Sequence, residues 1–145
     1  MRKIYLASPF FNDRERAYVD VVASILRTKG FDVFVPMEHQ IDPDKKLLNV
    51  VWGKQVFKMD LNAILECDAL VAIYYGMESD SGTAFEIGYA YSNAIPIVAI
   101  HAYDKYKVAA NLMVSSAATA NITWPEFMTY DFKRLPQVPY KGICK

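Results

Sequence analysis

The chain lacks an excess of charge of either sign, and this absence limits its partners. Sixteen basic and sixteen acidic residues cancel, so no broad positive field exists to hold a phosphate backbone or an anionic membrane surface. No apolar run approaches the ~20 residues that span a bilayer, and the charged start of the chain is unlike a secretory signal. We therefore expect neither nucleic acid nor membrane as a partner, and we expect a cytoplasmic location.

Side chains that ligate metals or form disulfides are scarce. The chain has two cysteines, Cys67 and Cys144, which lie far apart, and two isolated histidines, His39 and His101. Two distant cysteines in such a chain are more often free thiols than a disulfide. The four residues do not have the spacing of a metal site. We expect no metal and no bound cofactor, and we interpret Cys67 as part of the core.

The segment after the first apolar run lacks the residues of a phosphate-binding loop. It is Ala-Ser-Pro-Phe-Phe at residues 7–11, whereas flavodoxin-type carriers and phosphate-loop proteins use a turn rich in glycine or hydroxyls. The acidic residues that response receivers need at the end of this strand are also missing. The sequence therefore supports neither of these non-enzymatic classes.

Hydrophobic periodicity predicts strands that alternate with helices. A length of 145 residues, 53% of them apolar, fits a single domain over residues 1–145. The last predicted helix ends at residue 119, and the segment after it is expected to be irregular. The predicted strands are 3–7, 31–35, 68–75 and 96–101, and the predicted helices are 12–29, 49–66, 82–93 and 111–119.

This alternation favours an α/β fold with a parallel sheet, helices on both faces and right-handed crossovers. We expect a five-stranded sheet of flavodoxin-like (Rossmann-like) order, 2-1-3-4-5. In that order the chain reverses direction between strands one and three, and ligands bind outside the carboxyl ends of the strands at this switch point. Residues 8–12 and 76–86 must meet there.

Glu86 is the first candidate for chemistry. It lies among small and apolar neighbours in the predicted helix 82–93, where a carboxylate is out of place. Small neighbours allow a ligand to approach closely, and apolar walls strengthen electrostatic effects by excluding water. The alternative is an amphipathic helix whose single acid faces solvent. The position of Glu86 at the switch point favours function.

Three further residues are candidates with structural alternatives. Asp80 precedes the same helix and could serve only as its N-cap. Asp60 interrupts an otherwise apolar helix and could be an exposed polar position. Tyr5 could belong to the core, but a buried hydroxyl needs a partner, and Glu86 across the switch point is one.

Four separated motifs resemble the nucleoside 2-deoxyribosyltransferase family over roughly residues 3–135. Any one of them would be a weak signal, but the four in order are strong. They are IYLASPFF at residues 4–11, KMDLNAI at 58–64, DSGTAFEIGYA at 80–90 and NLM at 111–113.

The resemblance implies a set of catalytic roles. Glu86 would attack the anomeric carbon and form a covalent deoxyribosyl-enzyme while the base departs. Asp60 would supply or relay a proton to the base, and Tyr5 would orient the nucleophile. This chemistry suits carboxylates, because one beside the anomeric carbon stabilises an oxocarbenium-like sugar and a second acid helps the base to leave.

The resemblance also implies binding roles and an assembly. Phe11 and Gln40 would line the base pocket. Asp80, together with Asn111 from an adjacent subunit, would hold sugar hydroxyls. The expected partners are deoxyribonucleosides, free nucleobases and further copies of the chain in a homohexamer built from dimers.

The sequence thus predicts a transferase that moves 2-deoxyribose between the bases of 2′-deoxyribonucleosides. One alternative is a hydrolase that releases bases from 2′-deoxyribonucleoside 5′-monophosphates, in which water replaces the acceptor base. Another is a non-catalytic nucleotide-binding or sensing domain of the same fold. Product analysis distinguishes the first two, and any turnover excludes the third.

Overall fold

The computed structural model of the chain describes residues 2–145, apart from the side chain of Glu78, and within these residues five parallel strands form one sheet. Their order, β2-β1-β3-β4-β5, confirms the predicted flavodoxin-like α/β fold. The switch point therefore lies between β1 and β3, which pair directly. The strands are β1 (Lys3–Ala7), β2 (Asp32–Phe34), β3 (Ala69–Tyr74), β4 (Ile97–His101) and β5 (Ala120–Thr123).

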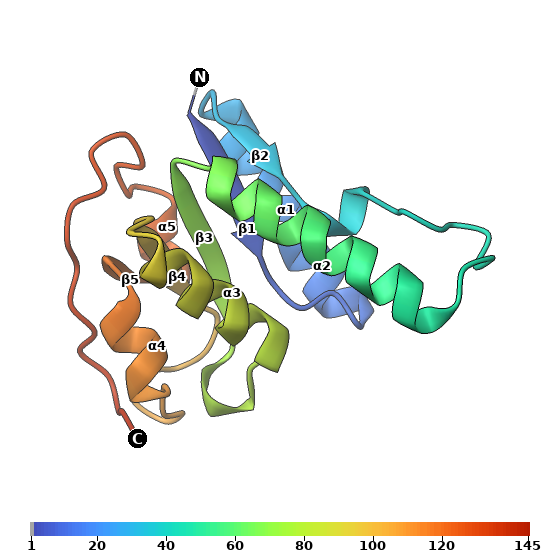
Figure 1. Ribbon diagram of the computed structural model, residues 1–145. Helices are drawn as coiled ribbons and strands as arrows, with labels where there is room; N and C mark the ends of the chain where they lie inside the picture. The colour runs from blue at the N-terminus through green and yellow to red at the C-terminus, as the bar shows by residue number, and fades with distance from the viewer. Residues whose placement is uncertain (1) are drawn as a thin grey trace.

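Helices cover both faces of the sheet. Figure 1 shows α2, α3 and α4 in front of the sheet, and α1 behind it. Among residues 2–145, no helix is both long enough and apolar enough to cross a membrane. The helices are α1 (Asp13–Thr28), α2 (Asn49–Glu66), α3 (Ser81–Ser92), α4 (Leu112–Ala117) and the short α5 (Trp124–Phe127).

The strands divide their side chains between two hydrophobic clusters. Because side chains alternate along a strand, Ile4 and Leu6 of β1 pack on the α1 side, whereas Tyr5 and Ala7 face α2 and α3. We call the face covered by α2, α3 and α4 the front face. Tyr5 therefore points to the side of the sheet where the helix that carries Glu86 lies.

A side-chain cap begins the first helix. The Asn12 side chain accepts a hydrogen bond from the Glu15 N–H at 2.9 Å. The Glu15 carboxylate accepts from the N–H of Phe11 at 2.7 Å. The helix ends before Gly30, whose φ of 91° is the left-handed conformation common after a helix C-terminus.

The segment after residue 119 is more regular than predicted. It contains β5, the edge strand that pairs with β4, and the turn of helix α5, whose capping box joins Thr123 and Glu126. The expectation of an irregular ending was wrong for residues 120–127. Asn121 interrupts the apolar pattern of this strand because its side chain pairs with a buried histidine.

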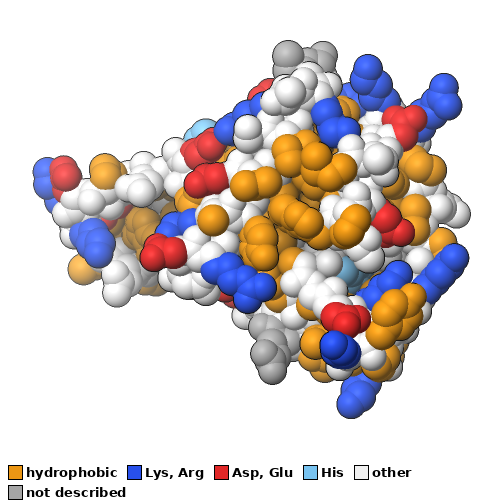
Figure 2. Space-filling model, turned by 180° about the vertical axis from the view of Figure 1, so that it is seen from behind, with side chains coloured by type: hydrophobic (Ala, Val, Ile, Leu, Met, Phe, Trp, Pro, Cys, Tyr) orange, Lys and Arg blue, Asp and Glu red, His pale blue; other side chains and the backbone are white. Residues whose placement is uncertain are grey.

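Helix α2 has the predicted bounds, but most of its apolar side chains are not buried. In this single chain only Ile64 of the helix is buried, while Trp52, Phe57 and Leu65 remain exposed. Its first half projects from the body together with the preceding loop (Figure 1). Figure 2 shows the opposite face, where basic and acidic side chains are interspersed. Within one chain, the sheet therefore buries only one side of α2.

Candidate active site

Tyr5 and Glu86 meet at the switch point, as predicted. Strand β1 places the Tyr5 ring at 0% exposure, and its hydroxyl donates a hydrogen bond of 2.8 Å to Oε1 of Glu86 on α3. Burial and the neighbouring Glu86 carboxylate hold the pKa of Tyr5 far above its ordinary value, so the phenol stays a donor. This contact fixes the carboxylate against the sheet.

The Glu86 carboxyl lies in an environment that disfavours its charge. Burial raises the pKa of Glu86 to about 7, and the negative charges of Asp60 and Asp80 act in the same direction. The hydrogen bond from Tyr5 opposes them by stabilising the charged form. The prediction that Glu86 is an acid facing inward, rather than a solvent-facing one, is confirmed geometrically.

Asp60 reaches the same region from α2. Its Oδ1 is buried and has no hydrogen-bond partner among the described residues. Burial raises the pKa of Asp60 to about 6, while the nearby His39 lowers it. A buried carboxylate oxygen without a partner is costly unless something else binds it. The exposed-polar alternative for Asp60 is therefore wrong.

Asp80 is the N-cap of α3, which was the structural alternative for this residue. Its Oδ2 accepts from the N–H of Thr83 at 2.9 Å and from the Thr83 hydroxyl at 3.3 Å. Gly82 makes room for this cap, because a Cβ there would lie 2.8 Å from Oδ2. Capping does not remove Asp80 from the site, since its charge still acts on Glu86.

Phe11, Gln40 and Asn111 stand apart from this cluster within one chain. Phe11 is 75% exposed and Gln40 is also exposed. Asn111 caps α4 by accepting from the Met113 N–H, and its own N–H donates to the Tyr74 hydroxyl at 3.0 Å. Across residues 2–145, no hydrogen bond joins these three residues to Glu86 or Asp60. Four of the seven candidates thus come together.

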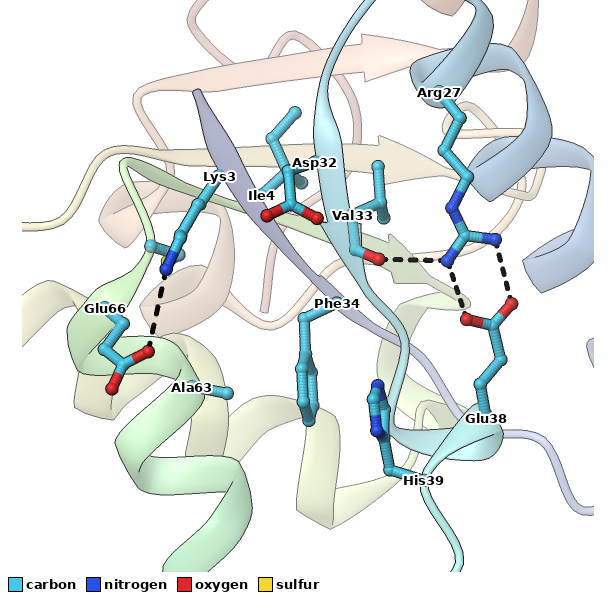
Figure 3. Close-up of a pocket in the computed structure, with 11 residues that line it drawn as sticks. Lys3, Ile4, Arg27, Asp32, Val33, Phe34, Glu38, His39, Ala63 and Glu66 are labelled. Carbon is cyan, nitrogen blue, oxygen red and sulfur yellow. Dashed lines mark hydrogen bonds and ion pairs between the residues drawn. The ribbon is translucent and has the colours of Figure 1, made fainter. Parts of the chain in front are cut away.

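A hollow of about 330 Å³ lies elsewhere, along the edge strand β2. Figure 3 shows its wall, with the Arg27–Glu38 pair on one side and the Lys3–Glu66 pair on the other. The candidate catalytic residues do not line it. Because Tyr5, Asp60, Asp80 and Glu86 lie outside this hollow, we assign the chemistry to the carboxylate cluster.

Two residues of interest were not singled out in the sequence. His39 was judged isolated, yet its ring stacks on Phe34 and its charge acts on Asp60. Tyr75 follows β3, and its buried hydroxyl has no hydrogen-bond partner within residues 2–145. Neither belongs to a local motif, so only the fold reveals them. In the described residues, no group of three or more His, Cys, Asp or Glu side chains could hold a metal ion.

Comparisons with known proteins cover nearly the whole chain. Residues 4–126 match the sequence profile of the nucleoside 2-deoxyribosyltransferase family. A nucleoside deoxyribosyltransferase of Limosilactobacillus fermentum is 34% identical over 136 residues, which are 86% of this chain and 79% of that relative. A 2-deoxyribosyltransferase structure from Bacillus psychrosaccharolyticus has a TM-score of 0.84 and 35% identity, over 96% of this chain and 99% of the other.

A further solved structure shares the fold alone. It is a CMP N-glycosidase of Clostridium botulinum, with a TM-score of 0.52, 24% identity and 71% of each chain covered. The matches to deoxyribosyltransferases are closer in both sequence and structure. They include the three segments that carry Tyr5, Asp60 and Glu86.

Proposed function

Because the chain belongs to the nucleoside 2-deoxyribosyltransferase family, we propose that it transfers 2-deoxyribose between nucleobases through a covalent bond to Glu86. The observation that carries this proposal is the buried cluster in which Tyr5 holds Glu86 beside the unpartnered Asp60. A nucleophile fixed by one group, with a second acid at hand, suits a two-step displacement at an anomeric carbon.

In the first step Glu86 attacks C1′ of the nucleoside. Tyr5 occupies Oε1 of Glu86, and among the described residues Oε2 forms no hydrogen bond. Oε2 therefore forms the bond to C1′ while the bond from C1′ to the base nitrogen breaks, and the base leaves with the electron pair. In the second step an incoming base displaces Glu86 from the other face, so the configuration at C1′ is retained.

Asp60 acts on the base in this proposal. Burial raises the pKa of Asp60 to about 6 and that of Glu86 to about 7, so both carboxyls titrate close to neutral pH in the free protein. The reaction needs Glu86 charged and Asp60 protonated. A bound base would desolvate Asp60 and raise its pKa, and positive charge on the sugar would lower that of Glu86. Substrate binding therefore favours the protonation states that the reaction needs.

Asp80 has a free oxygen for the sugar. Both bonds from Thr83 go to Oδ2, and within residues 2–145 nothing donates to Oδ1. We assign Oδ1 to the 5′-hydroxyl of the nucleoside. Phe11 and Gln40, both exposed in one chain, are assigned to the base.

The test is an exchange assay with deoxyinosine and adenine, followed by chromatography. We expect deoxyadenosine and hypoxanthine, together with a deoxyribosyl mass adduct on Glu86 when the acceptor is withheld. Release of free deoxyribose and base at a rate that added adenine does not change would contradict transfer and support the N-glycosidase alternative.

We also propose that the active form is an oligomer, a hexamer built from dimers, with Asn111 serving a neighbouring site. Large apolar side chains on the helices of the front face remain exposed in one chain, and burying them against a second copy would stabilise the assembly. These side chains are Val50, Val51, Trp52, Phe57, Leu65, Phe85, Tyr91, Leu112 and Met113.

Subunit mixing tests this assembly. Glu86→Ala and Asn111→Ala proteins, each inactive alone, should regain part of the activity when mixed, because some sites then contain both intact residues. Sedimentation of the wild-type protein should give the mass of a hexamer. A monomer with full activity would contradict the proposal.

A further inference from the structure

The segment just before Gln40 is fixed by a bidentate ion pair. Arg27 of α1 donates from Nη1 to Oε1 of Glu38 at 2.9 Å and from Nη2 to Oε2 at 2.6 Å. The same Nη2 donates to the carbonyl of Val33 on β2 at 3.0 Å (Figure 3). The guanidinium thus joins Glu38 to the edge strand, in the fork geometry that favours bidentate Arg–carboxylate pairs.

The next residue is fixed by ring stacking. The His39 imidazole lies parallel to the Phe34 ring, with centroids 4.3 Å apart and planes 3° apart (Figure 3). Phe34 stacks in turn on Tyr5, at 5.5 Å and 14°. Since Tyr5 donates to Glu86, one line of rings connects His39 with the proposed nucleophile.

Gln40 follows these two anchors directly and has none of its own. In the described part of the chain its side chain forms no hydrogen bond. The loop beyond it is closed locally by Asp42, which accepts from the N–H groups of Lys46 and Leu47 at 3.0 and 2.8 Å. The placement of Gln40 relative to the site therefore depends on Glu38 and His39.

We propose that Glu38 and His39 are positioning residues that hold Gln40 at the base-binding end of the site and so set the affinity for the nucleobase. This inference rests on the proposed function, in which Gln40 contacts the base. A backbone segment that is fixed before binding loses less conformational entropy when the base arrives. The stack also connects this segment to Tyr5, so the residues proposed to bind the base and the proposed nucleophile are held in a fixed relative position.

The test compares His39→Ala and His39→Phe in steady-state exchange with deoxyinosine and adenine. His39→Ala removes the stack, whereas His39→Phe keeps a ring on Phe34. We expect His39→Ala and Glu38→Ala each to raise KM for adenine roughly tenfold, which corresponds to about 1.4 kcal/mol, while kcat stays within about twofold of the wild type. His39→Phe should have the KM of the wild type.

Glu66→Gln is the matched control. Glu66 lines the same hollow and pairs with Lys3 at 3.8 Å, but it lies on the opposite wall, at the end of α2. Its substitution should leave KM and kcat unchanged. Unchanged KM in both alanine variants would overturn the inference, and so would a loss in His39→Phe equal to that in His39→Ala. A fall in kcat at constant KM would overturn it too.

Calorimetric binding of adenine keeps the inference separate from the reaction. If the wild-type protein binds adenine without exchanging bases, the proposed transfer fails, but a roughly tenfold weaker Kd in His39→Ala still supports positioning. An equal Kd in the two proteins overturns it. If the wild-type protein neither binds adenine nor exchanges it, both proposals fail.

Discussion

Two buried polar clusters lie on the front face of the same sheet, and they differ in whether their hydrogen bonds are complete. Around β4 and β5, His101 bonds to Asn121 through Nε2 at 2.8 Å and to the Tyr103 hydroxyl through Nδ1 at 2.7 Å. Around β1 and α3, Tyr5 bonds Glu86, but the neighbouring Asp60 keeps a buried oxygen without a partner among the described residues. We call them the closed and the open cluster.

In the closed cluster, the direction of each bond follows from its neighbours. The Asn121 amide nitrogen donates to the Ser115 carbonyl at 2.9 Å, so its oxygen accepts from Nε2–H of His101. Nδ1 then accepts from Tyr103, which accepts from the hydroxyl of Tyr140 at 3.2 Å. Burial lowers the pKa of His101, consistent with a neutral ring. A satisfied, neutral network stabilises a fold without offering a ligand anything to bind.

The open cluster has the opposite properties. Its carboxyl groups have raised pKa values, near 7 for Glu86 and near 6 for Asp60, because burial disfavours their charge. Such groups reduce stability in the free protein and become useful when a substrate of complementary charge arrives. Under the proposed function, the closed cluster stabilises the fold and the open cluster carries out the chemistry.

The largest effect that the comparison predicts is on activity, at the open cluster. Glu86→Gln keeps an oxygen that can accept from Tyr5 but removes the nucleophile, so exchange should fall by about a thousandfold or more, which is upwards of 4 kcal/mol. Exchange rates per folded protein measure it, with circular dichroism to confirm the fold. Turnover close to that of the wild type would remove the basis of the proposed mechanism.

The next effect concerns the second acid of the open cluster. Asp60→Asn cannot deliver a proton, so exchange should fall about a hundredfold with poor leaving groups and much less with good ones. A series of deoxyribonucleosides whose bases differ in acidity measures this dependence. Equal losses across the series would give Asp60 a structural role instead.

The closed cluster should respond in stability rather than in chemistry. Asn121→Leu leaves the His101 Nε2–H and the Ser115 carbonyl without their partner, which should cost about 2 to 3 kcal/mol. For a chain of this size, the melting temperature should fall by roughly 8 °C. Exchange measured well below that temperature should stay within about threefold of the wild type. A loss of kcat as large as that of Glu86→Gln would show that the two clusters are not independent.

The sequence predicted much of the open cluster but none of the closed cluster. The strand order placed Tyr5 and Glu86 on adjoining segments of the switch point, and their contact was predicted. The closed cluster was not predicted, because Asn121 on β5 is distant in sequence from His101 and Tyr103, and none of the three belongs to a local motif. The polar Asn121 also concealed β5, since a period-two apolar pattern cannot identify a strand with a satisfied polar residue inside.

At the site, too, the prediction was limited because contacts between distant segments, or between chains, cannot be deduced from a local sequence pattern. The bounds of α2 were correct, but its apolar surface depends on what lies beyond one chain. The roles of Phe11, Gln40 and Asn111 stay predictions, because these residues reach no other site residue within the chain. The stacking of His39 on Phe34 arises from the turn at Pro36–Glu38, which has no signature that a single sequence would reveal.

A smaller effect than those above is expected in the pH dependence of stability. The pKa of Glu86 rises from 4.5 in the unfolded chain to about 7 in the folded protein. The folded state therefore keeps a proton that the unfolded state has lost between these values. The contribution of Glu86 to the free energy of unfolding is complete below pH 4.5 and is lost as the pH rises through 7.

Glu86→Gln removes this loss. The free energy of unfolding of the variant, relative to that of the wild type, should be about 2 kcal/mol higher at pH 8 than at pH 5. The reason is that the wild type must bury a charge only at pH 8. Urea unfolding at both pH values measures the difference. Asn121→Leu, in the closed cluster, is the control, since the destabilisation there should be similar at the two pH values. An equal effect of Glu86→Gln at both would mean that the carboxyl is not desolvated.

The smallest expected effect is on the choice between nucleosides and nucleotides, and it concerns Asp80. One carboxylate oxygen of Asp80 accepts hydrogen bonds, and the other has no donor among the described residues. Oδ2 caps α3 through Thr83, while Oδ1 is proposed to accept from a 5′-hydroxyl. A 5′-phosphate beside this carboxylate would meet like-charge repulsion of about 4 kcal/mol per pair of unit charges at 4 Å in a partly screened site. One third of that energy is a tenfold preference for nucleosides over nucleotides. Asp80→Ser keeps a good N-cap and removes the charge, so α3 should remain intact while the preference disappears. The measurement is kcat/KM for deoxyadenosine against its 5′-monophosphate in both proteins. If the ratio is the same in both proteins, Asp80 is only a helix cap. If the wild type prefers the nucleotide, the N-glycosidase alternative explains the open cluster better.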